Sequence, residues 1–459
     1  MKNIELNKLK EIHFVGIGGI GMRGIAEYLL HDGYSVSGSD LNTSQNTDFL
    51  ESAGVSIYIG HKESNIQKPD LVVYSSAIPE KNIELITARN INIPTIKRSE
   101  MLGLITQIKK YCIAICGTHG KTTTTSMVSK VFEYAELDPV TIVGGIDANF
   151  GSTTRLGNGD VIIVEADEFD KSFLKLSPTH IAITSIDLDH QEDYHSIENV
   201  KQVFLQFINN LPKDGIVALC ENDINTRKII PQISHHTVSY GIDTHAEIMA
   251  TNIHISNGLI KCIVNTPVGS CSMLLQLPGN HNIQNALAAV SLGLEFGIPL
   301  KIICEALSHF KGVERRMEII HESNKMVLID DYAHHPAEIE ATIKAVRSKW
   351  KRRIIAIFQP HLYSRTQSFY KEFAETLNLA DVVIVTGIYP AREEPISGIS
   401  GEMIVNEFSR RDRMVYIENK SDVPKFLKKI MLNGDLIITM GAGDINLISK
   451  NILELVQSI

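Results

Sequence analysis

The chain has 459 residues, more than one hydrophobic core usually supports, so about three domains are expected. Its 44 Lys and Arg against 53 Asp and Glu give a net charge of -9 at pH 7, which argues against nucleic acid as the main partner. Six cysteines without a C-x-x-C pair, no apolar run of the roughly 18 residues that span a bilayer, and no signal-peptide pattern predict a soluble cytoplasmic protein with reduced thiols.

Residues 1–106 are expected to form a small parallel α/β domain. A short apolar strand, Ile12–Val15, leads into the glycine-rich sequence GIGGIG, and a helix-compatible run follows as far as Leu30. A second strand ends near Asp40, about 20 residues downstream, as in a dinucleotide-binding fingerprint. The glycines of this loop are Gly16, Gly18, Gly19 and Gly21.

The spacing of these glycines, taken alone, indicates NAD. Physically it predicts a pyrophosphate at a helix N-terminus, where backbone amides favour negative charge, and it does not identify the nucleotide. The alternative is that the glycines serve only close packing of the helix on the strand. Ser75 and Ser76 follow the expected strand Leu71–Tyr74, where they would either bind phosphate oxygens or cap the next helix.

Residues 107–314 contain a phosphate-binding loop. The sequence YCIAICGTHGKTTTT reads as a strand, a glycine-containing turn and a helix start, which favours a triphosphate site over a turn with an exposed lysine. Ile115 stands where the first glycine of the full pattern would be, so the loop is a short form. Backbone amides and the lysine would hold the phosphates, and a threonine hydroxyl would hold Mg²⁺. The loop residues are Gly117, Thr118, His119, Gly120, Lys121, Thr122 and Thr123.

Carboxylates follow the next apolar strand, Val161–Val164. Carboxylates at the end of a buried strand, in a chain with a phosphate loop, are expected to hold Mg²⁺. Glu165 is the first candidate, with Asp167 and Glu168 as alternates. A further strand, His180 to Ser185, ends shortly before Asp187, Asp189 and His190. A lone histidine is more often structural, but one beside two carboxylates at a strand end could complete a metal site.

Two amide side chains, Asn282 and Asn285, stand in the sequence LPGNHNIQNALAA. They are three residues apart and would face the same side of a helix. Amides suit a purine edge or a ribose because they both donate and accept hydrogen bonds. The pattern alone, however, favours a polar cap on an amphipathic helix.

Residues 315–459 again alternate strands and helices, and polar residues gather where the strands end. A doubly wound sheet binds ligands along that edge. The expected strands are 327–329, 354–358, 382–385 and 436–439. The polar residues are Asp330, Asp331, Tyr332, His334 and His335 after the first strand, and His361 and Arg365 after the second. A tight turn follows the last strand, and Asp444 is expected to cap the helix after it.

A set of motifs along the chain resembles the Mur ligases. In order they are GIGGIGM, GTHGKTTTT, EADE, DHQEDY, PGNHNIQNA, GVERRME, DDYAHHP and FQPHLYSRT, and they span nearly the whole sequence. The resemblance implies three α/β domains: a Rossmann-like domain (1–106), a central ATP-binding domain (107–314) and a second Rossmann-like domain (315–459). It also implies that the first domain binds a UDP-sugar, not NAD.

The resemblance further implies an ATP-dependent ligase of peptidoglycan precursor synthesis. ATP would phosphorylate the lactyl carboxylate of UDP-N-acetylmuramate, and the amine of L-alanine would attack the acyl phosphate to form an amide. Catalysis would rest on positioning and on cations around the transferring group. The nearest alternative is a ligase that recycles muramyl peptides, and an NAD-dependent oxidoreductase and a non-catalytic nucleotide sensor are alternatives of other classes.

Individual roles also follow from the resemblance. Lys121 would contact the β and γ phosphates, and Arg316 would reach the γ phosphate. Thr122, Glu165 and His190 would hold Mg²⁺. The other ATP contacts would come from Gly117, Thr118, His119, Gly120, Thr123, Asn282, Asn285 and Asp331. The UDP-sugar would lie on Gly16, Gly18, Gly19, Gly21, Asp40, Ser75 and Ser76, and the amino acid on His334, His361 and Arg365.

Overall fold

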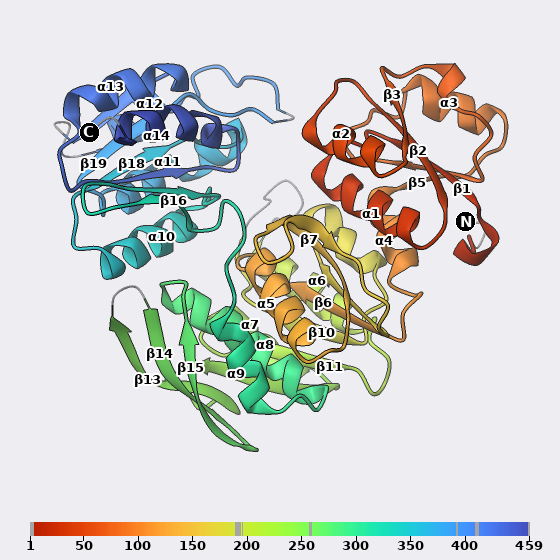
Figure 1. The fold of residues 1–459 in the computed structure, drawn as a ribbon, viewed down its shortest axis with the longest axis horizontal. Coiled ribbons are helices and arrows are strands. Elements are labelled where there is room, and N and C mark those ends of the chain that lie inside the picture. The colour runs from red at the N-terminus through yellow and green to blue at the C-terminus, as the bar shows by residue number, and fades with distance from the viewer. Residues whose placement is uncertain are drawn as a thin grey trace. The chain divides into compact units, whose positions relative to one another are not determined.

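The computed structural model describes residues 4–188, 194, 196–256, 259–391, 393–408 and 413–457. The described strands form three sheets of five, ten and six strands with helices packed on them, which confirms the three-domain α/β class (Figure 1). By compactness the chain divides into two units. The first comprises Met1–Asn252, Cys262–Met273 and Ile283–Phe310, and the second comprises Ile253–Lys261, Leu274–Asn282 and Lys311–Ile459. The domain boundaries drawn from the sequence stay a prediction.

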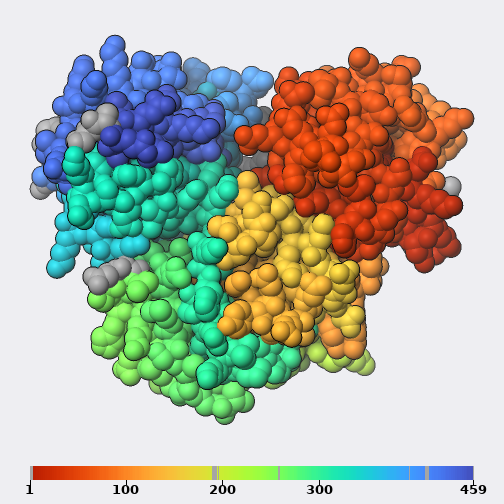
Figure 2. Space-filling view, viewed as in Figure 1, coloured from red at the N-terminus to blue at the C-terminus, as the bar shows by residue number. Residues whose placement is uncertain are grey.

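The first sheet is parallel, in the order β3-β2-β1-β4-β5. From β1 the chain runs to one edge and then returns to β4, so the carboxyl ends of these two neighbouring strands flank the crevice in which open α/β sheets bind ligands. The residues of this sheet and its helices, red to orange in Figure 2, pack into a continuous body. The strands are β1 (Glu11–Val15), β2 (Ser35–Asp40), β3 (Ser56–Ile59), β4 (Leu71–Tyr74) and β5 (Thr95–Lys97).

Helices cover both faces of the first sheet, because its central strands carry apolar side chains on both sides. Ser44 and Asn82 accept backbone N–H groups at the starts of α2 and α3. Since Asn82 caps α3, the alternative in which Ser75 or Ser76 caps that helix is wrong. The helices are α1 (Ile20–His31), α2 (Gln45–Ser52), α3 (Ile83–Asn90) and α4 (Arg98–Ile105).

The second sheet has the order β15-β14-β13-β12-β11-β10-β6-β9-β7-β8. Strand β6 lies between β9 and β10 and is parallel to both, so the loop that leaves β6 lies between their carboxyl ends. The strands are β6 (Tyr111–Cys116), β7 (Val140–Asp147), β8 (Ser152–Arg155), β9 (Val161–Glu165), β10 (His180–Ile183), β11 (Ile216–Cys220), β12 (His236–Ile242), β13 (Ile248–Ser256), β14 (Leu259–Thr266) and β15 (Gly269–Leu275).

Helix α5 begins directly after the loop that follows β6. A short 3-10 helix, η3 (Phe169–Lys175), follows β9. One apolar core runs through the first and the second sheet. The helices of the central part are α5 (Lys121–Tyr134), α6 (Ile197–Ile208), α7 (Ile224–Ile229), α8 (Asn280–Glu295) and α9 (Leu300–Ser308).

The third sheet has the order β16-β17-β21-β18-β19-β20, and β16 is its antiparallel edge strand. Separate apolar cores lie on its two faces, as a doubly wound sheet requires. Its strands are β16 (Glu318–Glu322), β17 (Val327–Asp331), β18 (Ile354–Phe358), β19 (Val382–Thr386), β20 (Met414–Ile417) and β21 (Leu436–Met440). Its helices are α10 (Pro336–Lys349), α11 (Tyr363–Leu377), α12 (Glu402–Asn406), α13 (Val423–Ile430) and α14 (Ser449–Gln457).

The expected helix cap by Asp444 is wrong. This residue stands at the start of a short 3-10 helix, η6 (Ile445–Ile448), but its side chain accepts no cap hydrogen bond there. Its carboxylate instead accepts from the Gln359 amide at 2.9 Å and pairs with Lys420 at 2.6 Å. Partners that are distant in sequence therefore outcompete the local backbone.

All six cysteines carry free thiols, and five of them are buried. Among the helices that the structure describes, none is at once long and apolar enough to cross a membrane.

Candidate active site

The phosphate-loop candidate connects the buried strand β6 to the N-terminus of α5. Gly117 and Gly120 have φ of 131° and 81°, a region that favours glycine. A Cβ on Gly120 would lie 2.6 Å from Asn285 Oδ1, and one on Gly117 would overlap the Thr184 hydroxyl. Conformation and space therefore both require glycine at these two positions.

The segment after β10 braces the loop from one side. Thr118 N and His119 N donate to the backbone oxygen and the hydroxyl of Ser185, each at 3.0 Å. Thr118 Oγ1 accepts from Asp187 N at 2.8 Å, and Asp187 Oδ2 lies 3.7 Å from His119 Nε2. Ser185 is a supporting residue that sequence reasoning missed, because only the pairing of β6 with β10 brings it to the loop.

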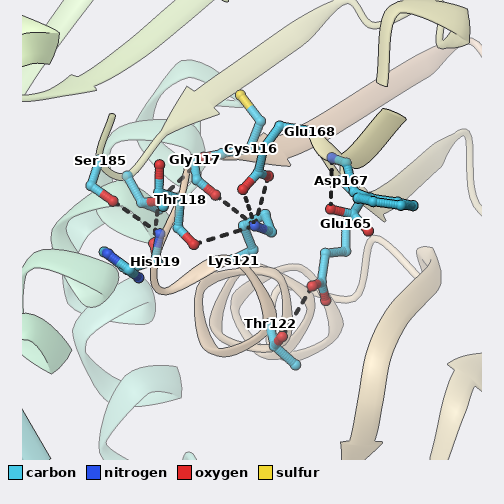
Figure 3. A network of polar contacts seen from close by, with 12 residues as sticks. Cys116, Gly117, Thr118, His119, Lys121, Thr122, Glu165, Asp167, Glu168 and Ser185 are labelled. Atoms are coloured by element: carbon cyan, nitrogen blue, oxygen red, sulfur yellow. Dashed lines mark hydrogen bonds and ion pairs between the residues drawn. The ribbon is translucent and has the colours of Figure 1, made fainter. Parts of the chain in front are cut away.

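Lys121, the first residue of α5, folds its ammonium back over the loop (Figure 3). Its Nζ donates to Gly117 O at 2.8 Å and to the two carboxylate oxygens of Glu168 at 2.7 and 3.0 Å. Burial alone would lower the pKa of Lys121, but the carboxylates of Glu168, Asp167 and Glu165 outweigh burial and raise it. The ammonium is therefore charged and held by carboxylates.

Thr122 and Glu165 form the second half of the loop site. Thr122 Oγ1 donates to Glu165 Oε1 at 3.0 Å, and the other carboxylate oxygen accepts from Gly144 N on β7 at 2.8 Å. A hydroxyl and a carboxylate at the end of a strand are the oxygen ligands that Mg²⁺ takes beside phosphates, so this pair fits the cation. The third expected ligand, His190, lies outside the described residues.

The structure separates the carboxylates that the sequence left as alternates. Glu165 faces Thr122, whereas Glu168 faces Lys121 and is 3% exposed. Asp167 Oδ1 accepts from the backbone N–H of Phe169 at 3.2 Å. Burial raises the pKa of Glu168 to about 7, although Lys121 lowers it. Of the three, Glu165 has the position expected of a metal ligand.

The asparagines lie in the first turns of α8. Asn285 approaches the loop at Gly120, as the glycine packing above shows. Asn282 is 3% exposed, and its amide donates to Pro278 O at 2.7 Å. Both side chains are buried polar groups at a helix start, so a surface polar cap does not describe them. Thr123 is also buried, in the first turn of α5.

The N-terminal glycine loop follows β1 and opens α1. Gly16 has φ of 81°, and Gly19 is the N-cap of α1. Asp40 Oδ2 accepts from Gly18 N and Asp40 Oδ1 from Leu41 N, both at 2.8 Å, so this carboxylate is tied to backbone near the loop. A Cβ on Gly18 would lie 2.9 Å from the same carboxylate. Asp40 therefore shapes the loop directly.

Two further side chains lie beside this glycine loop. A Cβ on Gly21 would be 3.2 Å from Arg98 Nη1, so this guanidinium is a cation at the loop that sequence reasoning missed. Ser75, at the end of β4, would lie 3.3 Å from a Cβ on Gly16, and its hydroxyl accepts from Ala77 N. Ser76 is exposed.

In the second unit, Arg316 and Asp331 lie beside Tyr332. The Arg316 guanidinium is 4.8 Å from the Tyr332 ring centre. Asp331 accepts from Met317 N and Ala333 N, each at 2.7 Å. Burial raises the pKa of Asp331 to about 6, although Arg316 lowers it. An arginine and a nearly buried carboxylate thus share the end of β17.

The amino-acid-binding candidates also come together in the second unit. The rings of His334 and His361 are 5.9 Å apart, and Arg365 Nη1 lies 3.3 Å from His361 Nδ1. Arg365 is 7% exposed, and Tyr389 stacks on His361 at 5.7 Å. A buried guanidinium beside imidazoles is suited to a carboxylate.

Comparisons with known families cover nearly the whole sequence. Three family models match: the Mur ligase family catalytic domain at residues 11–110, the Mur ligase middle domain at 115–293, and the Mur ligase glutamate ligase domain at 315–443. The "UDP-N-acetylmuramate--L-alanine ligase" of Sulfurihydrogenibium sp. (strain YO3AOP1) is 43% identical over 97% of this chain and 98% of its own. The ligase of the same name from Persephonella marina is 42% identical over 98% of each chain.

Two solved structures of ligases also match nearly the whole chain. The UDP-N-acetylmuramate-alanine ligase of Thermotoga maritima matches with a TM-score of 0.82 at 30% identity, covering 98% of this chain and 99% of that one. A murein peptide ligase from Psychrobacter arcticus 273-4 matches with a TM-score of 0.73 at 25% identity over the same shares.

Proposed function

Because this chain belongs to the Mur ligase family, we propose that it is an ATP-dependent ligase joining L-alanine to the lactyl carboxylate of UDP-N-acetylmuramate. One observation of the structure carries the proposal. Lys121, Thr122 and Glu165 lie around a glycine loop at a helix N-terminus, an arrangement that suits the phosphates and Mg²⁺ of the triphosphate that would activate the carboxylate. We place the reaction in cytoplasmic peptidoglycan precursor synthesis.

The reaction needs activation because a carboxylate is a poor electrophile. The γ-phosphoryl group of ATP passes to a carboxylate oxygen, ADP leaves, and the L-alanine amine then attacks the acyl carbon. The tetrahedral intermediate expels phosphate, which takes up the proton that the amine nitrogen loses, and an amide remains. Lys121 and Arg316 would supply positive charge to the transferring group, which is the main catalytic contribution expected in phosphoryl transfer.

Mg²⁺ would be held by Thr122, Glu165 and His190, and when bound it would neutralise phosphate charge. The loop residues Gly117–Thr123, with Asn282, Asn285 and Asp331, would bind the rest of ATP. Loop amides and a buried asparagine suit phosphate oxygens and a purine or ribose.

The remaining residues would hold the two other substrates. The N-terminal glycine loop with Asp40, Ser75 and Ser76 would bind the UDP-sugar, and Arg98 adds a cation there for the pyrophosphate. Arg365 would pair with the carboxylate of L-alanine, with His334 and His361 beside it.

The alternatives are less well supported. A peptide-recycling ligase has support from a murein peptide ligase, but the L-alanine ligase of Thermotoga maritima is more similar in both sequence and structure. An NAD-dependent oxidoreductase rests on the first glycine loop alone and does not explain the phosphate loop with Lys121 and Glu165. A nucleotide sensor does not explain the cluster around Arg365.

Phosphate release tests the proposal directly. The purified protein is supplied with ATP, Mg²⁺ and UDP-N-acetylmuramate, and with L-alanine, glycine, L-serine or a muramyl tripeptide as the amine. We expect fastest release with L-alanine, dependent on both co-substrates. A clear preference for the tripeptide would replace this function by peptide recycling, and no release with any amine would reject a ligase.

A further inference from the structure

The Lys121 ammonium has no spare hydrogen-bond donor in this structure. Its acceptors are the two carboxylate oxygens of Glu168, Gly117 O at 2.8 Å and Thr118 O at 3.4 Å. An ammonium has three donors, so these acceptors use all of them. A phosphate oxygen can reach Lys121 only by replacing one of its present partners.

Among these partners the carboxylate of Glu168 is the charged one, and contacts outside the phosphate loop hold the backbone of this residue. Glu168 follows β9 and stands at the start of η3. Its backbone oxygen accepts from Tyr194 Oη at 2.7 Å, and Tyr194 is 1% exposed. The next-door Asp167 is fixed by Ser172 Oγ, which donates to its backbone oxygen at 2.8 Å. Glu168 is therefore presented to Lys121 independently of the loop.

Stability alone is a weak reason for this pair. Removing two charges from water costs about as much as their attraction returns, so a buried ion pair stabilises a fold little compared with apolar residues. The side chains of Lys121 and Glu168 are only 14% and 4% exposed. A buried pair at the centre of a phosphate loop is better explained by the binding of an anion to the lysine.

We propose that Glu168 is the resident counter-ion of Lys121, which exchanges this carboxylate for the nucleotide phosphates when they bind. Glu168 is then a positioning residue, not a metal ligand: it keeps the lysine charged and folded over the loop until the phosphates arrive. The inference rests on the proposed function for the nature of the incoming anion. The pairing itself does not depend on it.

The first experiment measures nucleotide binding. Calorimetry with ADP and Mg²⁺ compares the wild type with Glu168→Gln and with Asp170→Asn, which removes the same charge from a side chain that is 55% exposed. Because Glu168→Gln removes the competitor for Lys121, we expect ADP to bind about tenfold more tightly. Asp170→Asn should bind ADP within about twofold of the wild type.

Glu168→Gln should also turn over more slowly than the wild type, because the lysine is no longer held at the loop, and Glu168→Asp should recover part of the rate. Unchanged or weaker ADP binding by Glu168→Gln would overturn the proposal. A raised Mg²⁺ requirement in place of tighter ADP binding would also overturn it and make Glu168 a metal ligand.

A second experiment needs no nucleotide. Thermal unfolding of Lys121→Met, Glu168→Gln and the double variant forms a double-mutant cycle. Each single change leaves a buried charge unpaired and should lower the midpoint by about 5 °C or more, and the double change should recover most of the loss. Additive losses would overturn the pairing. A ligase assay that fails while this cycle shows coupling would reject the proposed function and leave the pairing in place.

Discussion

Thr122 Oγ1 lies 3.0 Å from Glu165 Oε1, although 43 residues separate them in the chain. The sheet explains the contact, because β6, which leads through the loop to Thr122 on α5, is a neighbour of β9 and places Ile115 opposite Glu165. Gly144 N fixes the other carboxylate oxygen at 2.8 Å, so the side chain has one orientation toward the loop. The Thr122 hydroxyl and the Glu165 carboxylate thus place two oxygen ligands side by side, as a Mg²⁺ site needs.

Glu165→Gln should lower phosphate release about 100-fold at a fixed Mg²⁺ concentration, because a neutral amide is a poor ligand for this cation. Raising Mg²⁺ should restore part of the rate. The control is Asp160→Asn, an exposed carboxylate just before β9, which should behave as the wild type. A Mg²⁺ titration with the same midpoint in wild type and Glu165→Gln would contradict the assignment.

Arg365→Lys should raise the KM for L-alanine about 10- to 100-fold, since lysine cannot make the paired N–H contacts of a guanidinium with a carboxylate. The KM for ATP should stay within about twofold, because Arg365 lies beside His361, in the cluster proposed to bind the amino acid. Initial rates at saturating ATP and UDP-sugar measure both constants.

The matched control for Arg365 is Arg347→Lys, whose side chain is 46% exposed and pairs with Asp381 at 3.0 Å. It should leave both constants unchanged, because exposed ion pairs contribute little. Equal rises in the KM for ATP and L-alanine in Arg365→Lys would indicate a general structural defect and contradict a role in amino-acid binding.

Features that depend on neighbouring residues in the chain can be predicted from this sequence, whereas contacts between distant segments cannot. The strands Leu71–Tyr74 and Ile354–Phe358 are predicted to the residue, since an apolar run between turns defines a buried strand. Strand β3 is only partly buried, lacks such a run and is not predicted. The ends of predicted strands also locate the loop, Glu165 and the cluster around His361.

Contacts that depend on sheet order could not be predicted. Ser185 reaches the loop only because β10 lies next to β6, and Arg98 reaches Gly21 only because α4 packs near the start of α1. The cap expected of Asp444 fails for the same reason, because Gln359 and Lys420 come to it from other strand ends. Motifs identify the chemistry, and topology decides which side chains support it.

Glu84 gives the first unit a pH-dependent stability. Burial would raise the pKa of this fully buried carboxyl, but hydrogen bonds with His13, Ser39 and Asn65 outweigh burial and lower the pKa to about 2. A carboxyl with a depressed pKa stabilises the fold above its unfolded pKa, near 4.5, and the stabilisation is lost as the pH falls toward 2.

Urea unfolding at a series of pH values between 7 and 3 measures this effect of Glu84. The wild type should lose stability more steeply below about pH 4.5 than Glu84→Gln, which has no proton to gain. Glu51→Gln is the control, since that carboxylate is exposed on α2 of the same unit. Parallel pH profiles for wild type and Glu84→Gln would contradict the assignment.

Arg23 links the N-terminal glycine loop to the β7–β8 hairpin. Its Nη1 donates to Asn46 Oδ1 at 3.0 Å, and the Asn46 amide donates to Gly18 O at 2.8 Å. Its Nη2 reaches Ser152 Oγ on β8 at 3.4 Å. The side chain is 7% exposed, so a shorter residue would leave these polar groups without their partner.

Arg23→Ala should therefore raise the KM for the UDP-sugar about tenfold while the KM for ATP changes by less than about twofold, because Asn46 and Gly18 lose their support and the phosphate loop does not. Arg89→Ala is the matched control in the same sheet domain, since its ion pair with Glu80 is exposed. Steady-state kinetics with each substrate varied in turn separates the two constants. If Arg23→Ala left the KM for the UDP-sugar at the wild-type value and only lowered the thermal midpoint, Arg23 would hold the hairpin and not the glycine loop.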